Sequence, residues 1–187
     1  MPYKIGVLFN NANEKNFLFD DLDYYYKTNT LKGQLFYKLG NTLGLNFDLV
    51  VQPQIQFIKH QLLNEHFVQP EYGANYLEKR IEFTQLKSIH LYALEFGINT
   101  RKRITEKLNI QAQVGLGFSI IDTETERLAK GFTFIENGSL GLEYRTSTKT
   151  SLYIGSNIGH VSNFNFQQPN SGYNILGYEI AFRYLIK

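Results

Sequence analysis

The sequence predicts an all-β protein: an eight-stranded antiparallel up-and-down barrel that crosses a membrane. Apolar and polar residues alternate with a period of two along most of the chain, whereas helical periodicity is scarce. The composition, with 15 Gly, 13 Tyr and 15 Phe among 187 residues, is rich in residues typical of strands and turns. The links between the predicted strands are alternately short and long, which is typical of membrane barrels.

The alternation predicts eight strands. In the last of them, the even-numbered positions from Leu176 to Ile186 are apolar or aromatic, whereas the odd-numbered positions include Gly177, Glu179 and Arg183. The fifth strand repeats this pattern, with Gly and Gln opposite the apolar positions. The predicted strands cover residues 3–10, 31–40, 45–58, 88–100, 108–121, 132–145, 150–162 and 174–186.

The alternation alone permits two orientations of the apolar face. In a soluble sandwich or lipocalin-like barrel it points inward, and in a membrane barrel it meets lipid. The polar face is rich in Gly and Gln and carries charges that can pair, whereas a solvated exterior would carry more Lys and Glu. Small residues also suit the narrow interior of an eight-stranded barrel. These features favour the membrane barrel. The charges concerned are Glu95, Glu143, Arg145, Glu179 and Arg183.

The links support the same orientation. Those at 41–44, 101–107 and 146–149 are short, and those at 11–30, 59–87, 122–131 and 163–173 are long. Outer-membrane barrels have short periplasmic turns and long extracellular loops, so both termini are expected on the periplasmic side. We expect a short helix within 72–80. The aromatic runs Phe17–Phe19 and Tyr24–Tyr26 in the first long loop are either interfacial anchors or ordinary packing residues.

The bulk properties bound the remaining possibilities. The length suits one barrel domain, residues 1–187. The net charge of +2 is not concentrated in a basic run, so no nucleic-acid partner is expected. Cys is absent, and no apolar run approaches the roughly 20 residues of a membrane helix. The first residues lack the apolar core of a signal peptide, so we expect that an export signal has been removed and that Met1 is not native.

One pair of polar residues lies on the apolar face of the seventh predicted strand. His160 and Ser162 are two positions apart, so they point to the same side as Leu152, Ile154 and Ile158. An imidazole beside a hydroxyl is the minimal arrangement for an activated serine nucleophile. Desolvating unpaired polar groups in lipid costs a few kcal/mol, and such groups are usually retained for function. The alternative is that both lie at the interface, where water and headgroups satisfy them.

The residues around this pair resemble a known family. His160-Val-Ser162-Asn163, followed by Gln168-Pro-Asn170-Ser-Gly-Tyr-Asn174, resembles the signature of PagL-type lipid A 3-O-deacylases. The run from Asp122 to Phe132 is similar to members described as acyloxyacyl hydrolases. The resemblance implies an eight-stranded barrel in the outer membrane of a Gram-negative bacterium, removing an ester-linked acyl chain from lipid A.

The resemblance also implies roles for individual residues. Ser162 would be the nucleophile and His160 the general base, while Asn163 and Asn170 lie in the segment that binds the oxyanion and substrate. The backbone amide near Asn165 is a weaker candidate, because the family tends to have Gly there. Asn174 stands where the family has a Glu that orients the histidine. An Asn carbonyl can hold the imidazole tautomer but stabilises the imidazolium less than a carboxylate does.

We therefore predict an outer-membrane esterase that acts on lipopolysaccharide without metal or cofactor. His60, His66 and His90 lack metal-ligand spacing and are expected to be ordinary histidines. Asn174 favours one alternative, a non-catalytic structural or lipid-binding barrel. A soluble lipocalin-like binder of an apolar ligand is a third reading. A homodimer stays open beside a monomer.

Overall fold

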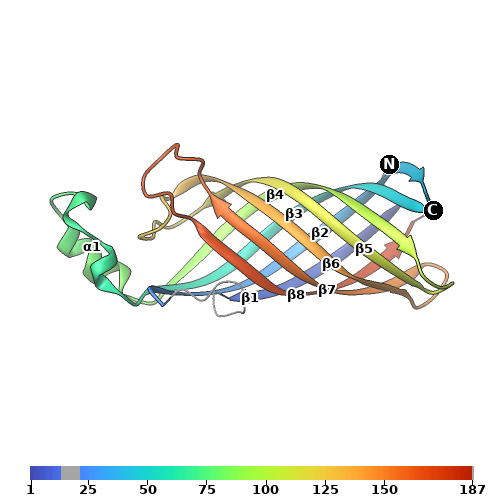
Figure 1. Cartoon of the computed structure of the whole chain (residues 1–187), viewed down its shortest axis with the longest axis horizontal. Coiled ribbons are helices and arrows are strands. Elements are labelled where there is room, and N and C mark those ends of the chain that lie inside the picture. The colour runs from blue at the N-terminus through green and yellow to red at the C-terminus, as the bar shows by residue number, and fades with distance from the viewer. Residues whose placement is uncertain (14–21, 187) are drawn as a thin grey trace.

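The chain forms a closed barrel of eight antiparallel strands, in which each strand pairs with the next and β1 pairs with β8 (Figure 1). The computed structural model describes residues 1–13 and 22–186. The predicted fold class is confirmed, and the bounds of β5 and β7 coincide with the predicted ones. The strands are β1 (Lys4–Asn13), β2 (Tyr24–Thr42), β3 (Leu45–Leu62), β4 (Lys87–Arg103), β5 (Leu108–Ile121), β6 (Gly131–Arg145), β7 (Thr150–Ser162) and β8 (Tyr173–Leu185).

The apolar faces of the strands point outward. Val7, Val114, Ile154 and Ile180 are each more than half exposed, as are many other large apolar side chains on the outer wall. The predicted orientation is therefore confirmed, since such a wall matches lipid rather than water. None of the helices in the described ranges is long and apolar enough to span a membrane.

Paired charges and amides fill much of the interior, whereas a cluster of buried apolar and aromatic side chains, among them Tyr26, Ile121 and Val161, fills it at the long-link end. The buried carboxylate of Glu95 accepts hydrogen bonds from Lys32 Nζ at 3.0 Å and from Asn137 Nδ2 at 2.8 Å, besides two glutamine amides. Glu143, closer to the short-turn end of the barrel, likewise binds Lys4 and Arg183. Buried charges are tolerated only when they are paired, so these networks permit a polar interior. A Cβ at Gly115 would overlap the Glu95 carboxylate, which explains glycine on the inner face of β5.

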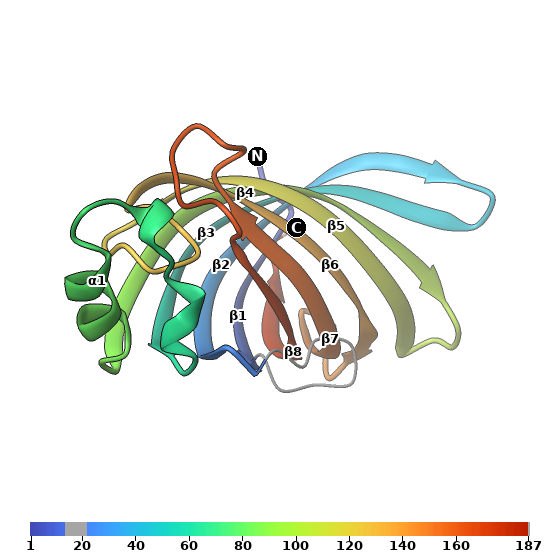
Figure 2. The same ribbon diagram turned by 60° about the vertical axis from the view of Figure 1, so that its left-hand side comes forward.

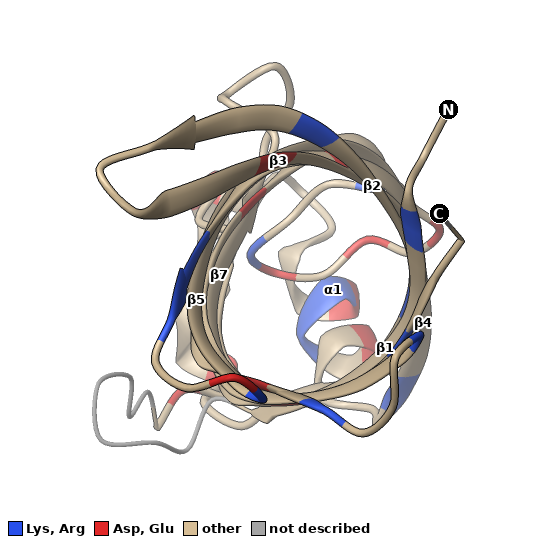
Figure 3. Ribbon diagram, turned by 90° about the vertical axis from the view of Figure 1, so that its right-hand side faces the viewer, with Lys and Arg blue, Asp and Glu red and all other residues tan. Residues whose placement is uncertain are grey.

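The two ends of the barrel differ. The turns 43–44, 104–107 and 146–149 are short and lie at the end that holds both termini, whereas the links 63–86, 122–130 and 163–172 are long and lie at the other end (Figure 1). The β2–β3 hairpin extends beyond the rest of the barrel on the short-turn side (Figure 2). A view along the axis from this side shows the closed ring (Figure 3). The predicted asymmetry of the links is confirmed.

The start of β2 corrects the prediction of a loop at Tyr24–Tyr26. β2 begins at Tyr24 rather than near residue 31, and Tyr24 and Tyr26 are buried inside the barrel. This part of the strand carries Lys27 and Asn29 on its outer side. Because it has no outward apolar stripe, the pattern that marks the membrane strands is missing here. The other expected aromatic run, Phe17–Phe19, lies outside the described residues.

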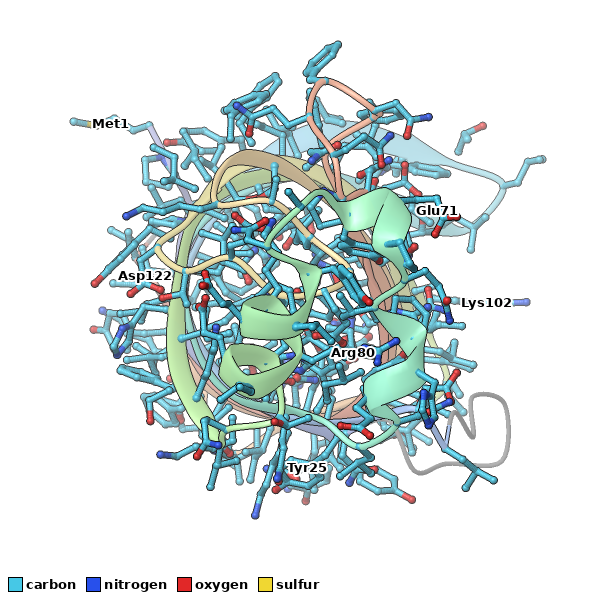
Figure 4. All side chains as sticks on the ribbon, turned by 90° about the vertical axis from the view of Figure 1, so that its left-hand side faces the viewer. Met1, Tyr25, Glu71, Arg80, Lys102 and Asp122 are labelled. Carbon is cyan, nitrogen blue, oxygen red and sulfur yellow. The ribbon has the colours of Figure 1, made fainter. Side chains whose placement is uncertain are left out.

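A helical segment stands beyond the strands at the long-link end. It contains the short 3₁₀ helices η1 (Glu65–Phe67) and η2 (Pro70–Tyr72) and the helix α1 (Tyr76–Phe83). In the view along the barrel from this end, α1 lies in front of the opening (Figure 4). Lys79 pairs with Glu124 at 3.0 Å, and the Tyr72 hydroxyl donates to the backbone of Glu126 at 2.9 Å. The segment therefore packs on the β5–β6 link.

Candidate active site

The outer end of β7 places His160 and Ser162 on the outer wall of the barrel. Both side chains are half-buried, whereas Val161 and Asn163 between and beyond them are buried on the inner side. The neighbouring strands set what faces the pair. His160 lies opposite Asn174 of β8 and opposite Glu136 of β6.

His160 and Asn174 are brought into direct contact. Nδ1 of His160 lies 2.7 Å from Oδ1 of Asn174, so the ring N–H donates to the side-chain carbonyl. An imidazole that carries its proton on Nδ1 has a lone pair on Nε2. Nε2 can therefore act as a base.

The backbone of Gly172 lies close to the His160 ring. Its φ of +64° is in the left-handed region that favours glycine. A Cβ at this position would overlap the carbonyl oxygen of Val161 and lie 3.1 Å from His160 Cε1. Sequence reasoning did not assign Gly172 a role, although the Ser-Gly pair just before a predicted strand is a recognisable turn signal.

Ser162 is adjacent to His160 but not bonded to it. Residues two apart in a strand are separated by about 6.6 Å along the chain direction. Among residues 1–13 and 22–186, no group hydrogen-bonds the Ser162 hydroxyl. Catalytic hydrogen bonds are often long in ligand-free enzymes and tighten when substrate binds, so the arrangement of His160 and Ser162 is compatible with a nucleophile–base pair.

The β7–β8 link is organised by its asparagines. The backbone N–H of Asn163 donates to Oδ1 of Asn170 at 2.6 Å, and Nδ2 of Asn170 donates to Oδ1 of Asn165 at 3.0 Å. The side chain of Asn163 is buried and its Nδ2 donates to the carbonyl of Gln167 at 3.0 Å. Asn165 has a φ of +62°, a conformation that Asn adopts more readily than most residues other than Gly.

The β5–β6 link holds the Gly172 turn in place. Arg127 Nε donates to the carbonyl oxygen of Gly172 at 3.1 Å, and the Gly172 N–H donates to the Arg127 carbonyl at 2.9 Å. The guanidinium lies over the Tyr24 ring at 4.4 Å. Next to it, His60 and Glu126 form a fully buried pair at 2.6 Å. His60 thus has a carboxylate as its partner within the barrel.

Asp122 begins the same link and binds His90 of β4. The backbone N–H of His90 donates to Asp122 Oδ1 at 3.0 Å, and His90 Nδ1 lies 2.9 Å from Oδ2. Burial opposes ionisation of this carboxyl. The hydrogen bonds from His90 and Thr123 outweigh burial and hold the pKa of Asp122 below its ordinary value.

Two apolar hollows on the outer wall adjoin the His160 pair. The larger, of about 790 Å³, runs across β4, β5 and β6 to His160 and Asn174; its lining includes Phe96, Ile98, Val114, Leu116 and Ile158. The smaller, of about 350 Å³, is lined by aromatic residues, among them Phe118, Phe134 and Phe164. Phe134 lies opposite Ser162 in the β6–β7 register. The Phe164 ring packs edge-on against the Phe134 ring, with the two ring centroids 4.5 Å apart.

Glu136 lines both hollows and is not among the residues that the sequence motif indicates. It is exposed on the outer side of β6, between Phe134 and Gly138 at the same parity. The signal was present in the sequence, because an acid that shares a parity with Phe132, Phe134 and Leu140 is out of place on a lipid-facing stripe.

Comparison with known proteins agrees with both the fold and the sequence motif. Residues 94–183, from β4 to β8, match the family model of lipid A 3-O-deacylase (PagL). The crystal structure of the outer membrane enzyme PagL superposes with a TM-score of 0.61 at 12% identity, covering 96% of this chain and 97% of that one. Neisserial surface protein A (NspA) superposes with a TM-score of 0.53 at 10% identity, covering 97% and 96%. No curated protein sequence is significantly similar to this chain. The chain is a β-barrel of the outer-membrane type, and residues 94–183 resemble the PagL family, as the motif around His160 predicted.

Proposed function

We propose that this protein is an esterase of the Gram-negative outer membrane that hydrolyses an ester-linked acyl chain of lipid A. The observation that carries the proposal is the outward-facing His160–Ser162 pair, with His160 bonded to Asn174 at 2.7 Å beside an apolar hollow. The match of residues 94–183 to lipid A 3-O-deacylases supports the same reaction. His160 and Ser162 come from β7 and Asn174 from β8, so neighbouring strands of one chain supply the whole group.

The reaction proceeds through an acyl-enzyme. Ser162 Oγ attacks the ester carbonyl while His160 Nε2 takes the hydroxyl proton. When the tetrahedral intermediate collapses, the bond to the sugar oxygen breaks and His160 returns the proton to that oxygen. Water then attacks the acyl-serine with His160 again as base, which releases the fatty acid and regenerates the serine hydroxyl. The sum is ester plus water to acid plus alcohol.

Asn170 is our candidate for the oxyanion donor. The Asn163 N–H binds Asn170 Oδ1, which fixes the orientation of the Asn170 amide and directs its Nδ2 donors away from Asn163. The Nδ2–Asn165 contact is exposed and can be exchanged for a contact with the oxyanion. The backbone N–H and the side-chain Nδ2 of Asn163 both donate hydrogen bonds within the link, so we assign Asn163 the role of holding Asn170.

The surroundings suit an acyl chain that ends at an ester. Phe164 and Phe166 are exposed beside the catalytic pair, and aromatic residues concentrate where acyl chains meet headgroups. An ester of lipid A lies at the same boundary. The hollow of about 790 Å³ extends from His160 over the apolar wall and can take the chain that is removed.

Asn174 favours a second candidate, a non-catalytic lipid-binding barrel. Without a carboxylate, the imidazolium formed during catalysis is less stabilised. The two candidates differ in what an added carboxylate does. If the wild-type protein is inactive and Asn174→Glu restores release of fatty acid, the chain is a non-catalytic relative of an enzyme.

The test is release of fatty acid from purified lipopolysaccharide by the folded protein in detergent. The wild-type protein is expected to release it and Ser162→Ala is expected to release none. Ser156→Ala is the matched control, because Ser156 lies on the same outer face of β7 away from the long links. Equal release by wild type and Ser162→Ala would refute the serine assignment.

A further inference from the structure

Glu136 is an acid on the membrane-facing wall of the barrel. It is exposed on β6, and the neighbours at its parity are Phe134 and Gly138. Within the described ranges, no Lys or Arg nitrogen lies within 4.0 Å of its carboxylate. An ionisable group on such a wall is costly and is usually retained for function.

The register of the sheet places this acid beside the candidate base. Glu136 lies directly opposite His160 in the β6–β7 pair, and Asn174 lies opposite His160 in the β7–β8 pair. Side chains directly opposite one another in an antiparallel pair have Cβ atoms about 4.5–5.5 Å apart. Glu136, His160 and Asn174 also line one hollow. His160 is therefore flanked by a neutral amide on one side and a carboxylate on the other.

We infer that Glu136 is a positioning residue that supplies the negative charge Asn174 lacks. This inference rests on the proposed Ser162–His160 esterase. Asn174 holds the tautomer through the Nδ1 hydrogen bond, while Glu136 stabilises the imidazolium through space when Nε2 takes the serine proton. Arg127, which also reaches this region, donates to the carbonyl of Gly172, and its guanidinium lies over the Tyr24 ring.

The charge effect is large enough to measure. Two unit charges about 6 Å apart at an effective dielectric constant of about 20 interact strongly enough to change a rate ~10- to 100-fold. Glu136→Gln is nearly isosteric and removes only the charge. It is therefore expected to lower kcat by this factor and leave KM nearly unchanged, because the isosteric amide keeps the shape of the hollow that Glu136 lines.

The experiment uses an alkyl fluorophosphonate as a probe that is independent of lipid A. Ser162 Oγ displaces fluoride from phosphorus while His160 takes the proton, so the labelling rate reports the serine–histidine pair alone. We expect Glu136→Gln to label ~10- to 100-fold more slowly than wild type. Glu136→Asp should retain most of the rate. Asn174→Glu should restore the rate when it is combined with Glu136→Gln. Glu106→Gln, in the exposed β4–β5 turn, is the matched charge control.

The outcomes separate this inference from the function on which it rests. Two results overturn the inference. One is a Glu136→Gln variant that is labelled at the wild-type rate. The other is an Asn174→Glu change that accelerates labelling of the wild-type protein but does not restore the labelling rate of Glu136→Gln. Labelling of Ser162 without fatty acid release from lipopolysaccharide refutes the lipid A substrate and leaves the role of Glu136 standing. Absence of labelling in the wild type overturns the serine site and this inference together. Heat-modifiable electrophoretic mobility shows whether each variant is a folded barrel.

Discussion

Replacing Gly172 with alanine tests whether the β7–β8 link positions the histidine. Gly172 has a φ of +64°, so the alanine is destabilising by about 1–2 kcal/mol from the left-handed conformation alone. The new methyl group would also overlap the Val161 carbonyl oxygen, and reaching van der Waals separation requires a shift of roughly 1 Å. His160 Cε1 lies 3.1 Å from the same methyl position, so the ring has to move with the turn.

The expected effect on catalysis exceeds the effect on folding. A misplacement of about 1 Å in a catalytic group lowers activity ~100-fold. Gly172→Ala is therefore expected to hydrolyse lipopolysaccharide ~100-fold more slowly than wild type while still folding as a barrel.

Gly44→Ala is the matched control for this variant. Gly44 has a φ of +75°, and nothing lies within 4 Å of a Cβ built on it, so it carries the conformational cost without the contact. The assay measures fatty acid release at equal amounts of folded protein, and thermal unfolding by heat-modifiable mobility. If Gly172→Ala and Gly44→Ala have equal activity, the assignment of Gly172 as the support of His160 is refuted.

Two further predictions concern the hollow and the outer links. Gly138→Leu should fill the larger hollow without blocking folding, because a Cβ built on Gly138 lies 3.5 Å from Ile158 Cγ2, an ordinary contact. Hydrolysis of long-chain nitrophenyl esters by this variant should then fall more than hydrolysis of short-chain esters. The control variant Gly138→Ala should resemble wild type. An unchanged chain-length preference in Gly138→Leu would contradict this use of the hollow. The pKa of Asp122 is lower in the folded protein than in the unfolded chain, where it is about 4, so the hydrogen bonds from His90 stabilise the folded link above that pH. This stabilisation is lost as the pH falls through the pKa that Asp122 has in the folded protein. Limited proteolysis of the β5–β6 link should increase at low pH in wild type, whereas Asp122→Asn should show no such step; identical pH profiles would count against the role of this carboxylate.

The membrane strands were predictable because lipid and a polar interior impose opposite demands on alternate residues. β5 and β7 have the predicted bounds because the alternation marks most of both strands, although the inward residues Ile121 and Val161 at their outer ends are apolar as well. The first residues of β2 were not predicted as strand because Lys27 and Asn29 stand where the outward apolar stripe would be. A period-two pattern identifies a strand only where its two faces meet different environments.

The candidate site was only partly predictable for a related reason. Parity places His160, Ser162 and Asn174 on one face, and the structure shows the His160–Asn174 contact. The position of Glu136 depends on the register of the β6–β7 hairpin, which its short turn fixes but which parity alone does not reveal. The support from Gly172 depends on the backbone of an irregular link, for which local sequence supplies only a turn signal.

The most direct test of the account is the mass spectrum of lipid A after exposure to the folded barrel. The wild-type protein should convert lipid A to a species lighter by one ester-linked acyl chain, and Ser162→Ala should leave the spectrum unchanged. Lipid A that keeps all its acyl chains after incubation with the wild-type protein, or loses one equally with Ser162→Ala, would contradict the account.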